Sequence, residues 1–351
     1  MNKAFKISLF LCLILLSTIL LPACGRQNEI SSNSEKQATI RNVNYSSLTE
    51  AVENAKSGDT IKIYTDLKDN KNVVISKPLT IKGVLNNRQI RPKFYGSITI
   101  DMNGENDSTS IENLEIVHQG TIKDGLNNDT RIGINLINGG LSFKSNIVSL
   151  DDENQADNGA SGIIISRKIN STNTQPILIK GNSFTSYKSD NNNTSAALII
   201  KSNLPNVFQK ITLNENDLLN QNSFETSKEG NLLLSVNYAQ EPAIFPFFAT
   251  TSITEILKAL NNHQPTSNST FILYPTQPLA EQQTEPYIIN ETTSLYIEGN
   301  TPADFNNTIF KLAGSMIVNS GLNNTIIEKT QGLSNIIFGE NATQSNVKII
   351  K

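Results

Sequence analysis

The sequence of 351 residues is poor in the side chains that most cofactor sites need, with no tryptophan, two histidines and two cysteines. Zinc, haem and iron–sulfur centres built from several His or Cys ligands are therefore almost excluded. Charged residues make up only 17% of the chain, and the net charge at pH 7 is −3. Because this balance cannot neutralise phosphates in bulk, the composition argues against a nucleic-acid partner.

The first residues combine a basic start with an apolar stretch that is short for a membrane-spanning helix. Lys3 and Lys6 precede a largely apolar run from Ile7 to Leu21, a pattern typical of a secretory signal. The run ends in Leu21-Pro22-Ala23-Cys24, which resembles the lipobox of bacterial lipoproteins. The resemblance implies cleavage just before Cys24 and diacylation of its thiol, and a plain signal peptide with an incidental cysteine is the alternative.

These motifs predict a protein of the cell envelope that is attached to a membrane by lipid and faces away from the cytoplasm. Residues 1–23 would be the signal peptide, and several acyl chains on Cys24 would hold the rest stably. Cys12 would leave with the signal, so the mature chain could form no disulfide. The polar residues 24–38 cannot bury enough surface to order themselves and are expected to form a flexible tether.

The folded part opens with a helix signal followed by short strands. Ser47-Leu48-Thr49-Glu50 is a capping box, after which apolar residues recur at helical spacing up to Ser57-Gly58-Asp59. Strands of three to five residues, separated by turn-formers, are then predicted at 60–64, 72–76 and 79–83. This opening resembles that of right-handed parallel β-helix proteins of the pectin-lyase-like superfamily, including NosD-type proteins. The resemblance implies an all-β solenoid whose short helix covers the open end of the coil.

The same order of signals returns near residue 250, where Ser252-Ile253-Thr254-Glu255 repeats the capping box and further short strands follow. This repeat predicts a β-helix domain at 39–245 and a second, smaller, helix-capped β unit at 246–351. Pro242 and Pro246 would interrupt any strand at the boundary. One continuous coil with a helical insertion is the alternative.

Between the two openings, three segments share the pattern apolar, x, apolar, x, x, Asn, x, apolar. Each begins as a strand with one buried face, and its Asn comes where the chain must turn. In β-helix proteins such Asn side chains stack, because an amide can donate to one rung and accept from the next. The predicted structural ladder consists of Asn146, Asn182 and Asn216. Partner strands on the same rungs are predicted from Gly133, Gly162 and Ala197.

Acidic residues after the aligned asparagines form one candidate site. Asp151 and Asp152 follow the first aligned asparagine, and Lys188 and Asp190 follow the second aligned asparagine. The superfamily resemblance implies that lyases use calcium-binding carboxylates with an Arg or Lys base, whereas hydrolases use paired Asp. These carboxylates would suit Ca²⁺ by ligand type, or two of them could serve as acid and base. A solvated polar loop is the simpler interpretation, and no cofactor other than Ca²⁺ is indicated.

A basic stripe is the second candidate site. Lys144 and Lys180 fall on one strand face, with Arg167 and Lys201 on neighbouring rungs, where they could meet a uronic-acid polymer. Lysines whose stems cover apolar surface are the alternative. His118 stands alone in the sequence and predicts no catalytic role.

Two functional classes stay open. A non-catalytic surface lipoprotein that binds a glycan or an envelope protein is favoured, because no catalytic set is complete. A polysaccharide lyase or glycoside hydrolase acting on acidic polysaccharide is the alternative, for which fold analogy is the main warrant. Metallocofactor maturation, by analogy to NosD-type proteins, is disfavoured because the chain has only two histidines.

Overall fold

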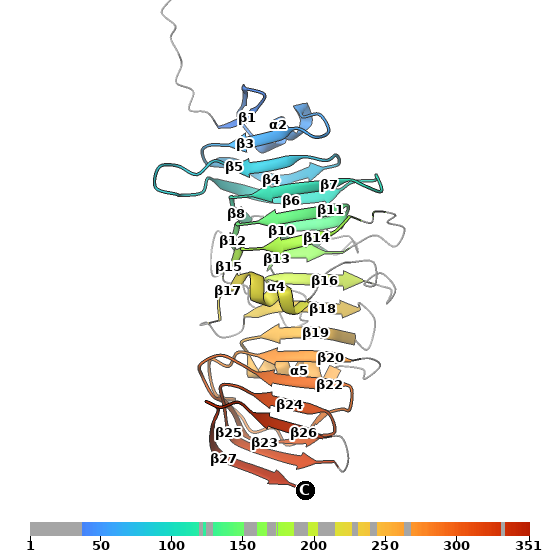
Figure 1. Ribbon diagram of the computed structural model, residues 1–351, viewed down its shortest axis with the longest axis vertical. Coiled ribbons are helices and arrows are strands. Elements are labelled where there is room, and N and C mark those ends of the chain that lie inside the picture. Colours follow the sequence, from blue (N-terminus) through green and yellow to red (C-terminus); the bar gives the residue numbers. More distant parts are fainter. Residues whose placement is uncertain are drawn as a thin grey trace, which may run out of the picture.

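A computed structural model describes residues 37–118, 122–123, 129–150, 160–166, 173, 175–185, 196–202, 215–226, 231–238, 244–262, 268–330 and 334–351. Over these residues the chain is mostly β, and its strands stack along the long axis of the molecule (Figure 1). Most neighbouring strands are parallel, which confirms the prediction of an all-β chain with parallel strands. The described helices are α2 (Leu48–Asn54), α4 (Glu215–Gln221) and α5 (Ile253–Asn262).

The first sheet has seven strands in the order β14-β11-β7-β5-β3-β1-β2. Its strands are parallel except that β1 runs antiparallel to both of its neighbours. The bounds are β1 (Ala38–Ile40), β2 (Val43–Tyr45), β3 (Thr60–Ile63), β5 (Thr80–Gly83), β7 (Ser108–Glu112), β11 (Gly140–Lys144) and β14 (Ile177–Lys180).

The second sheet has sixteen strands, and its main path is β17-β15-β12-β8-β6-β10-β13-β16-β18-β19-β20-β22-β24-β26. Strand β6 turns a corner at Gly96, so that its first residues pair with β8 and its last with β10. The bounds are β4 (Leu67–Ile75), β6 (Lys93–Asp101), β8 (Glu115–His118), β9 (Ile122–Lys123), β10 (Asp129–Asn138), β12 (Ile147–Leu150), β13 (Ala160–Ile165), β15 (Ser183–Phe184), β16 (Leu198–Ser202), β17 (Ser223–Phe224), β18 (Leu232–Tyr238), β19 (Ile244–Thr250), β20 (Ser269–Leu273), β22 (Thr293–Ile297), β24 (Ser315–Val318) and β26 (Asn335–Phe338).

The third sheet has four parallel strands in the order β21-β23-β25-β27. It lies toward the C-terminal end of the stack (Figure 1). The bounds are β21 (Tyr287–Ile289), β23 (Ala303–Leu312), β25 (Gly321–Lys329) and β27 (Thr343–Ile350).

The stacking register follows the sequence pattern. Leu141 pairs with Ile177 and Phe143 with Ile179, as their aligned segments predict, and all four side chains are buried. The partner strands β10, β13 and β16 also stack in the predicted register. Buried and exposed positions alternate along β14, so its apolar residues all face the core. Strand β13 is buried at all six positions, as expected for a parallel strand that is covered on both faces.

The predicted asparagine ladder is present for its first two members. The Oδ1 atom of Asn182 accepts from the backbone N and from Nδ2 of Asn146, at 2.9 and 3.2 Å. In turn, Nδ2 of Asn182 donates to the backbone O of Phe143 at 3.0 Å. Asn146 makes the equivalent bonds with the preceding strand layer, accepting from Leu114 N and donating to Ile111 O. Both asparagines are buried, so the ladder satisfies backbone groups that water cannot reach.

The third predicted member of the ladder is wrong. Asn216 lies in α4, whereas Asn222, directly after that helix, takes the ladder position. Oδ1 of Asn222 accepts from Nδ2 of Asn182 at 2.9 Å, and its own Nδ2 donates to Ile179 O at 2.9 Å. Helix α4 precedes the ladder residue and places it later in the chain than an alignment without gaps can accommodate.

Helix α2 forms where the capping box predicts it and lies near the N-terminal end of the stack (Figure 1). Ser47 Oγ accepts from the backbone N of Glu50 at 3.0 Å, while the Glu50 carboxylate reaches back to the backbone N of Ser46. Leu48, Ala51 and Val52 are buried beneath the helix in the same apolar cluster as the first strands. The helix that the second capping box predicts is confirmed as well, and Ser252 Oγ accepts from Glu255 N at the start of α5.

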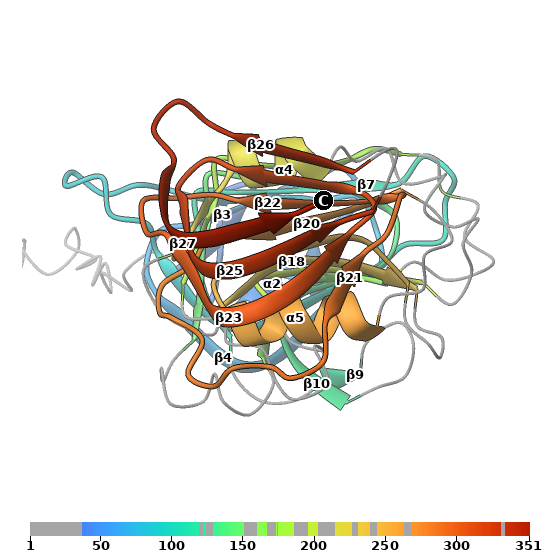
Figure 2. The same ribbon diagram turned by 90° about the horizontal axis from the view of Figure 1, so that it is seen from below.

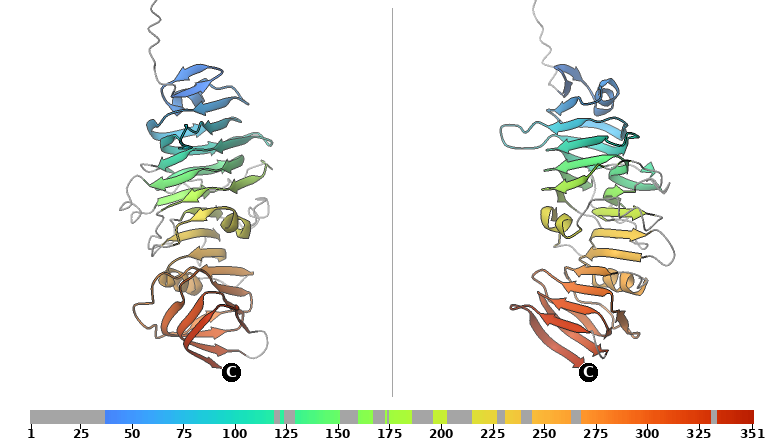
Figure 3. Two further views of the ribbon diagram at one scale, coloured as in Figure 1. Left: turned by 60° about the vertical axis from the view of Figure 1, so that its left-hand side comes forward. Right: turned by 45° about the vertical axis from the view of Figure 1, so that its right-hand side comes forward.

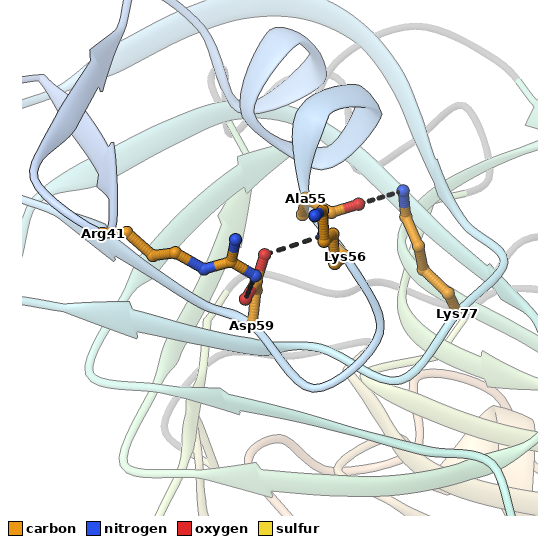
Figure 4. Close-up of polar contacts among 5 residues, drawn as sticks. All are labelled: Arg41, Ala55, Lys56, Asp59 and Lys77. Atoms are coloured by element: carbon orange, nitrogen blue, oxygen red, sulfur yellow. Dashed lines mark hydrogen bonds and ion pairs between the residues drawn. The ribbon is translucent and has the colours of Figure 1, made fainter.

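Polar contacts fix the chain where α2 ends (Figure 4). Lys77 Nζ donates to the backbone O of Ala55 at 2.6 Å, which places a cation beside the negative end of the helix. Asp59 accepts from the backbone N of Lys56 at 2.7 Å and pairs with Arg41 from the β1–β2 turn. The hydrogen bond from Lys56, together with the pairing to Arg41, holds the pKa of Asp59 below its ordinary value.

The main path of the sixteen-stranded sheet reverses direction in its lower half. Strands β18 and β19 pair antiparallel, with Val236 opposite Phe247 and Ser235 opposite Phe248. Pro246 lies within β19, so the expectation that it interrupts a strand is wrong. It lies opposite an irregularity of β18 between Val236 and Tyr238, a position where the sheet tolerates a missing N–H.

Two apolar cores lie on opposite faces of this sheet, one mainly above the reversal and one mainly below it, and each core extends across the reversal. Val236 and Phe247 belong to the upper core, whereas Phe248 belongs to the lower core with α5. Leu218 of α4 lies in the upper core. Accordingly, α4 and α5 are seen on opposite sides of the stack when it is viewed from below (Figure 2) and from the side (Figure 3, right). The division at residues 245 and 246 stays a prediction.

Candidate functional site

The outer face of the seven-stranded sheet carries a row of charged side chains at equivalent positions. Strand pairing aligns them across β3, β5, β7, β11 and β14, one per strand, at the strand spacing of about 4.8 Å. We call this row the lysine column, and it consists of Lys62, Lys82, Glu112, Lys144 and Lys180. Inward-facing neighbours such as Ile61 and Ile179 are buried, which directs the charged residues outward.

A second row runs beside the lysine column, two residues earlier on each strand. Its members are small hydroxyl side chains except on β14, where Leu178 is 39% exposed. We call it the hydroxyl column, and it consists of Thr60, Thr80, Ser110 and Ser142. The two columns together make a flat grid of ammonium and hydroxyl groups on the face of one sheet.

The lysine column is net positive although the chain is net negative. Glu112 offsets one charge, through an ion pair in which Lys82 Nζ lies 2.8 Å from its Oε1. Lys144 and Lys180 are directly opposite each other on neighbouring strands, a placement that destabilises a sheet through like-charge repulsion. Neither of the two makes an ion pair with any residue that the structure describes. An external anion would relieve this repulsion.

Only part of the basic stripe predicted from the sequence gathers on this face. Lys144 and Lys180 are brought together as expected, but Lys201 lies on β16 of the sixteen-stranded sheet. Arg167 lies outside the described residues. The sequence analysis missed Lys62 and Lys82, although each is the last residue of a Thr-Ile-Lys sequence. Both lie in strands that precede the asparagine motif.

The residues of the acidic candidate site lie outside the described part of the chain, namely Asp151, Asp152, Asp190 and the neighbouring Lys188, and so does the lipidation candidate Cys24. Among the residues that the structure does describe, no group of three His, Cys, Asp or Glu side chains is placed to hold a metal ion. Within that same part of the chain, no helix combines the length and apolar character needed to cross a bilayer.

His118 lies in the interior, on β8, and not on the lysine-column face. Burial, with a smaller contribution from the positive charge of Arg131, lowers the pKa of His118 to about 3. The imidazole is therefore neutral in the folded protein at physiological pH.

Acid is expected to destabilise the fold through His118. Its folded pKa is below the unfolded value of about 6.5, so below that pH the unfolded chain binds a proton that the folded chain does not. This contribution to stability falls by about 1.4 kcal/mol per pH unit, or about 2 kcal/mol between pH 7 and pH 5. Urea unfolding of wild type and His118→Leu at both pH values checks it. The variant should lose less stability on acidification, and an equal loss would contradict the prediction.

Comparisons of the chain with protein-family models, with curated proteins and with solved structures found no match.

Proposed function

We propose that this protein is a non-catalytic envelope lipoprotein that binds an anionic glycan along the lysine column. The observation that carries the proposal is the alignment of four lysines on five consecutive parallel strands. A polyuronate presents carboxylates at regular intervals, and lysine ammonium groups on flexible stems can adjust to them as point charges. The hydroxyl column beside them would exchange hydrogen bonds with the hydroxyl groups of the sugar rings.

The proposed fold is a right-handed parallel β-helix. Its support is the order in which the chain visits the sheets, since β7, β8 and β10 are followed by β11, β12 and β13 directly below them. Parallel strands joined by crossovers are nearly always connected in the right-handed sense. In this fold every added coil lengthens the lysine column by one position, which suits a polymeric ligand.

The proposed attachment is a lipid on Cys24, with residues 24–38 as the tether to the membrane. Its support is the lipobox-like sequence after the basic and apolar start. The folded part would then face away from the cytoplasm, where envelope polysaccharides are accessible. An envelope protein with an acidic surface is the other partner that the lysine column would suit.

Reversing two charges of the lysine column should weaken binding to polygalacturonate by about tenfold or more at low salt. The test is a titration of the purified full chain, comparing wild type with the double variant Lys144→Glu and Lys180→Glu. A matched control is Lys311→Glu with Lys348→Glu, two exposed lysines of the four-stranded sheet that give the same change in net charge. Affinity should also fall as salt is raised.

Equal weakening in both double variants would show that net charge, not the lysine column, controls binding. Failure of the wild type to bind polygalacturonate while it binds the neutral glucan dextran would also contradict the proposal. The same mixtures test the enzymatic alternative, which depends on Asp151, Asp152, Asp190 and Lys188. New absorbance from unsaturated products would show that the protein is a lyase, and new reducing ends without that absorbance would show that it is a hydrolase. Either result would contradict the proposal of a non-catalytic binding protein.

A further inference from the structure

The outer face of the four-stranded sheet is partly apolar, unlike the outer face of the seven-stranded sheet. Strand pairing aligns one outward residue from each of β21, β23, β25 and β27 in a single row across the sheet. A shorter, apolar row lies two residues earlier on β23 and β25. We call these residues the isoleucine face, and it consists of Ile288, Lys311, Glu328, Ile350, Ile309 and Ile326.

The isoleucine face presents apolar side chains to water. Ile288 is 59% exposed and Ile350 is 50% exposed, at the two edges of the sheet. Ile309 and Ile326 are paired on the two central strands and are partly exposed, whereas Phe310 between them and the core is buried. Parallel sheets are usually covered on both faces, and adjoining exposed apolar side chains mark interaction surfaces. We therefore expect a partner to cover this face.

The centre of the isoleucine face carries one charge of each sign. Lys311 on β23 and Glu328 on β25 are opposite each other on neighbouring strands. Neither side chain makes a hydrogen bond or an ion pair with a residue that the structure describes. Across the sheet the row is therefore apolar, positive, negative and apolar. A two-fold axis reverses the order of such a row, so that it places each charge against the opposite charge and the apolar ends against each other.

We propose that the isoleucine face binds the same face of a second copy of this chain to form a two-fold symmetric dimer. The axis runs along the strands between β23 and β25, so that β23 of one copy lies over β25 of the other. Lys311 then meets Glu328 of the partner subunit, and Ile309 packs against Ile326 of the partner subunit. Both contacts occur twice in the dimer, because the interface is isologous. Sheets packed face to face lie about 10 Å apart, a spacing at which their side chains interdigitate.

The isoleucine face is small, which limits the strength of the dimer. Four strands about 4.8 Å apart span about 19 Å. Interfaces that bury less than about 1,200 Å² belong to weak or transient complexes, and we expect a dissociation constant of about 10–100 μM. At about 1 μM the chain is then monomeric, so glycan titrations of wild type and of Lys311→Glu with Lys348→Glu at that concentration report on the monomer. The dimer and the proposed function can therefore fail independently.

Charge exchange between the two central positions tests the contact. Sedimentation equilibrium of the purified full chain, from about 1 to about 500 μM, measures the dissociation constant of the dimer. Lys311→Glu alone and Glu328→Lys alone should each weaken the dimer about tenfold or more, because like charges then face each other. The double variant, Lys311→Glu with Glu328→Lys, should return to within about threefold of wild type. Lys71→Glu, an exposed lysine of β4, is the matched control and should stay within about twofold.

Mixing the two single variants separates contacts between copies from contacts within one chain. A chain with Lys311→Glu and a chain with Glu328→Lys carry opposite charges at both contacts, so the mixture should dimerise as wild type does. Circular dichroism checks that both variants are folded. Ile288→Ser is a second variant that leaves the charges in place, and it should weaken the dimer about threefold or more through loss of an exposed apolar contact.

Four results would overturn the dimer. These are a wild-type chain that stays monomeric at about 500 μM, single variants that associate as strongly as wild type, a mixture of single variants that stays monomeric, and assemblies larger than a dimer. Association that ignores the charges at Lys311 and Glu328 would point to the N-terminal apolar run instead of the isoleucine face. Larger assemblies would indicate a head-to-tail contact, which does not close on itself.

Discussion

The alanine variant of Asn182 is expected to unfold with a free energy about 4 kcal/mol below that of wild type, because several buried polar groups lose their partners together. Asn182 is 2% exposed and joins two strand layers. Its removal leaves the backbone N of Asn146 and the backbone O of Phe143 without the bonds that the amide supplies. Each unsatisfied buried group costs about 1–3 kcal/mol. Urea unfolding monitored by circular dichroism measures the difference.

The comparison of Asn222 with Asn216 makes this test specific to the ladder. Asn222→Ala should cost about 2 kcal/mol, less than Asn182→Ala because its position is only partly buried. Asn216→Ala, in helix α4, should change stability by no more than about 0.5 kcal/mol, since alanine favours the helix. A loss at Asn216 as large as that at Asn222 would contradict the ladder described above.

The second large effect is expected at Gly83, where Gly83→Ala should cost about 3 kcal/mol or more because the added methyl group has no space. A Cβ atom there would lie 1.9 Å from the backbone O of Asn113 and 2.8 Å from its carbonyl carbon. Asn113 cannot easily move away, because its N donates to Lys144 O in the next strand layer and its φ is 59°. Thermal or urea unfolding measures the loss.

Gly58 provides the matched control for this substitution. No atom lies within 4 Å of a Cβ built at Gly58, and its φ of +83° is the remaining obstacle to a side chain. Gly58→Ala should therefore cost about 1–2 kcal/mol, from backbone strain alone. A Gly83→Ala variant as stable as Gly58→Ala would mean that the strand layers can separate at this corner.

The sequence predicted best those features that residues close together in the chain decide. The capping box at Ser47 predicts α2, and the alternation at Leu141 and Ile177 predicts both strands and their register. The prediction of the ladder failed after Asn182, because the seven-residue helix α4 precedes the next ladder residue, Asn222. The abundance of asparagine allowed the wrong residue to occupy the aligned position.

The candidate site was half predictable for a similar reason. Lys144 and Lys180 were found because their strands carry the asparagine motif, whereas Lys62 and Lys82 precede it. After β7, Leu114 occupies the position that an asparagine holds in the ladder, so the asparagine motif does not identify β7 as an equivalent strand.

The antiparallel pair β18–β19 has a consequence for dividing the molecule into parts. A cut at residues 245 and 246 would fall inside β19, not in a linker. Ile164 and Ile199, from strands above the reversal, share an apolar cluster with Ile256 of α5, which lies below it. A truncated protein that ended at such a cut would present these side chains to water, so the two halves depend on each other for solubility as well as for shape.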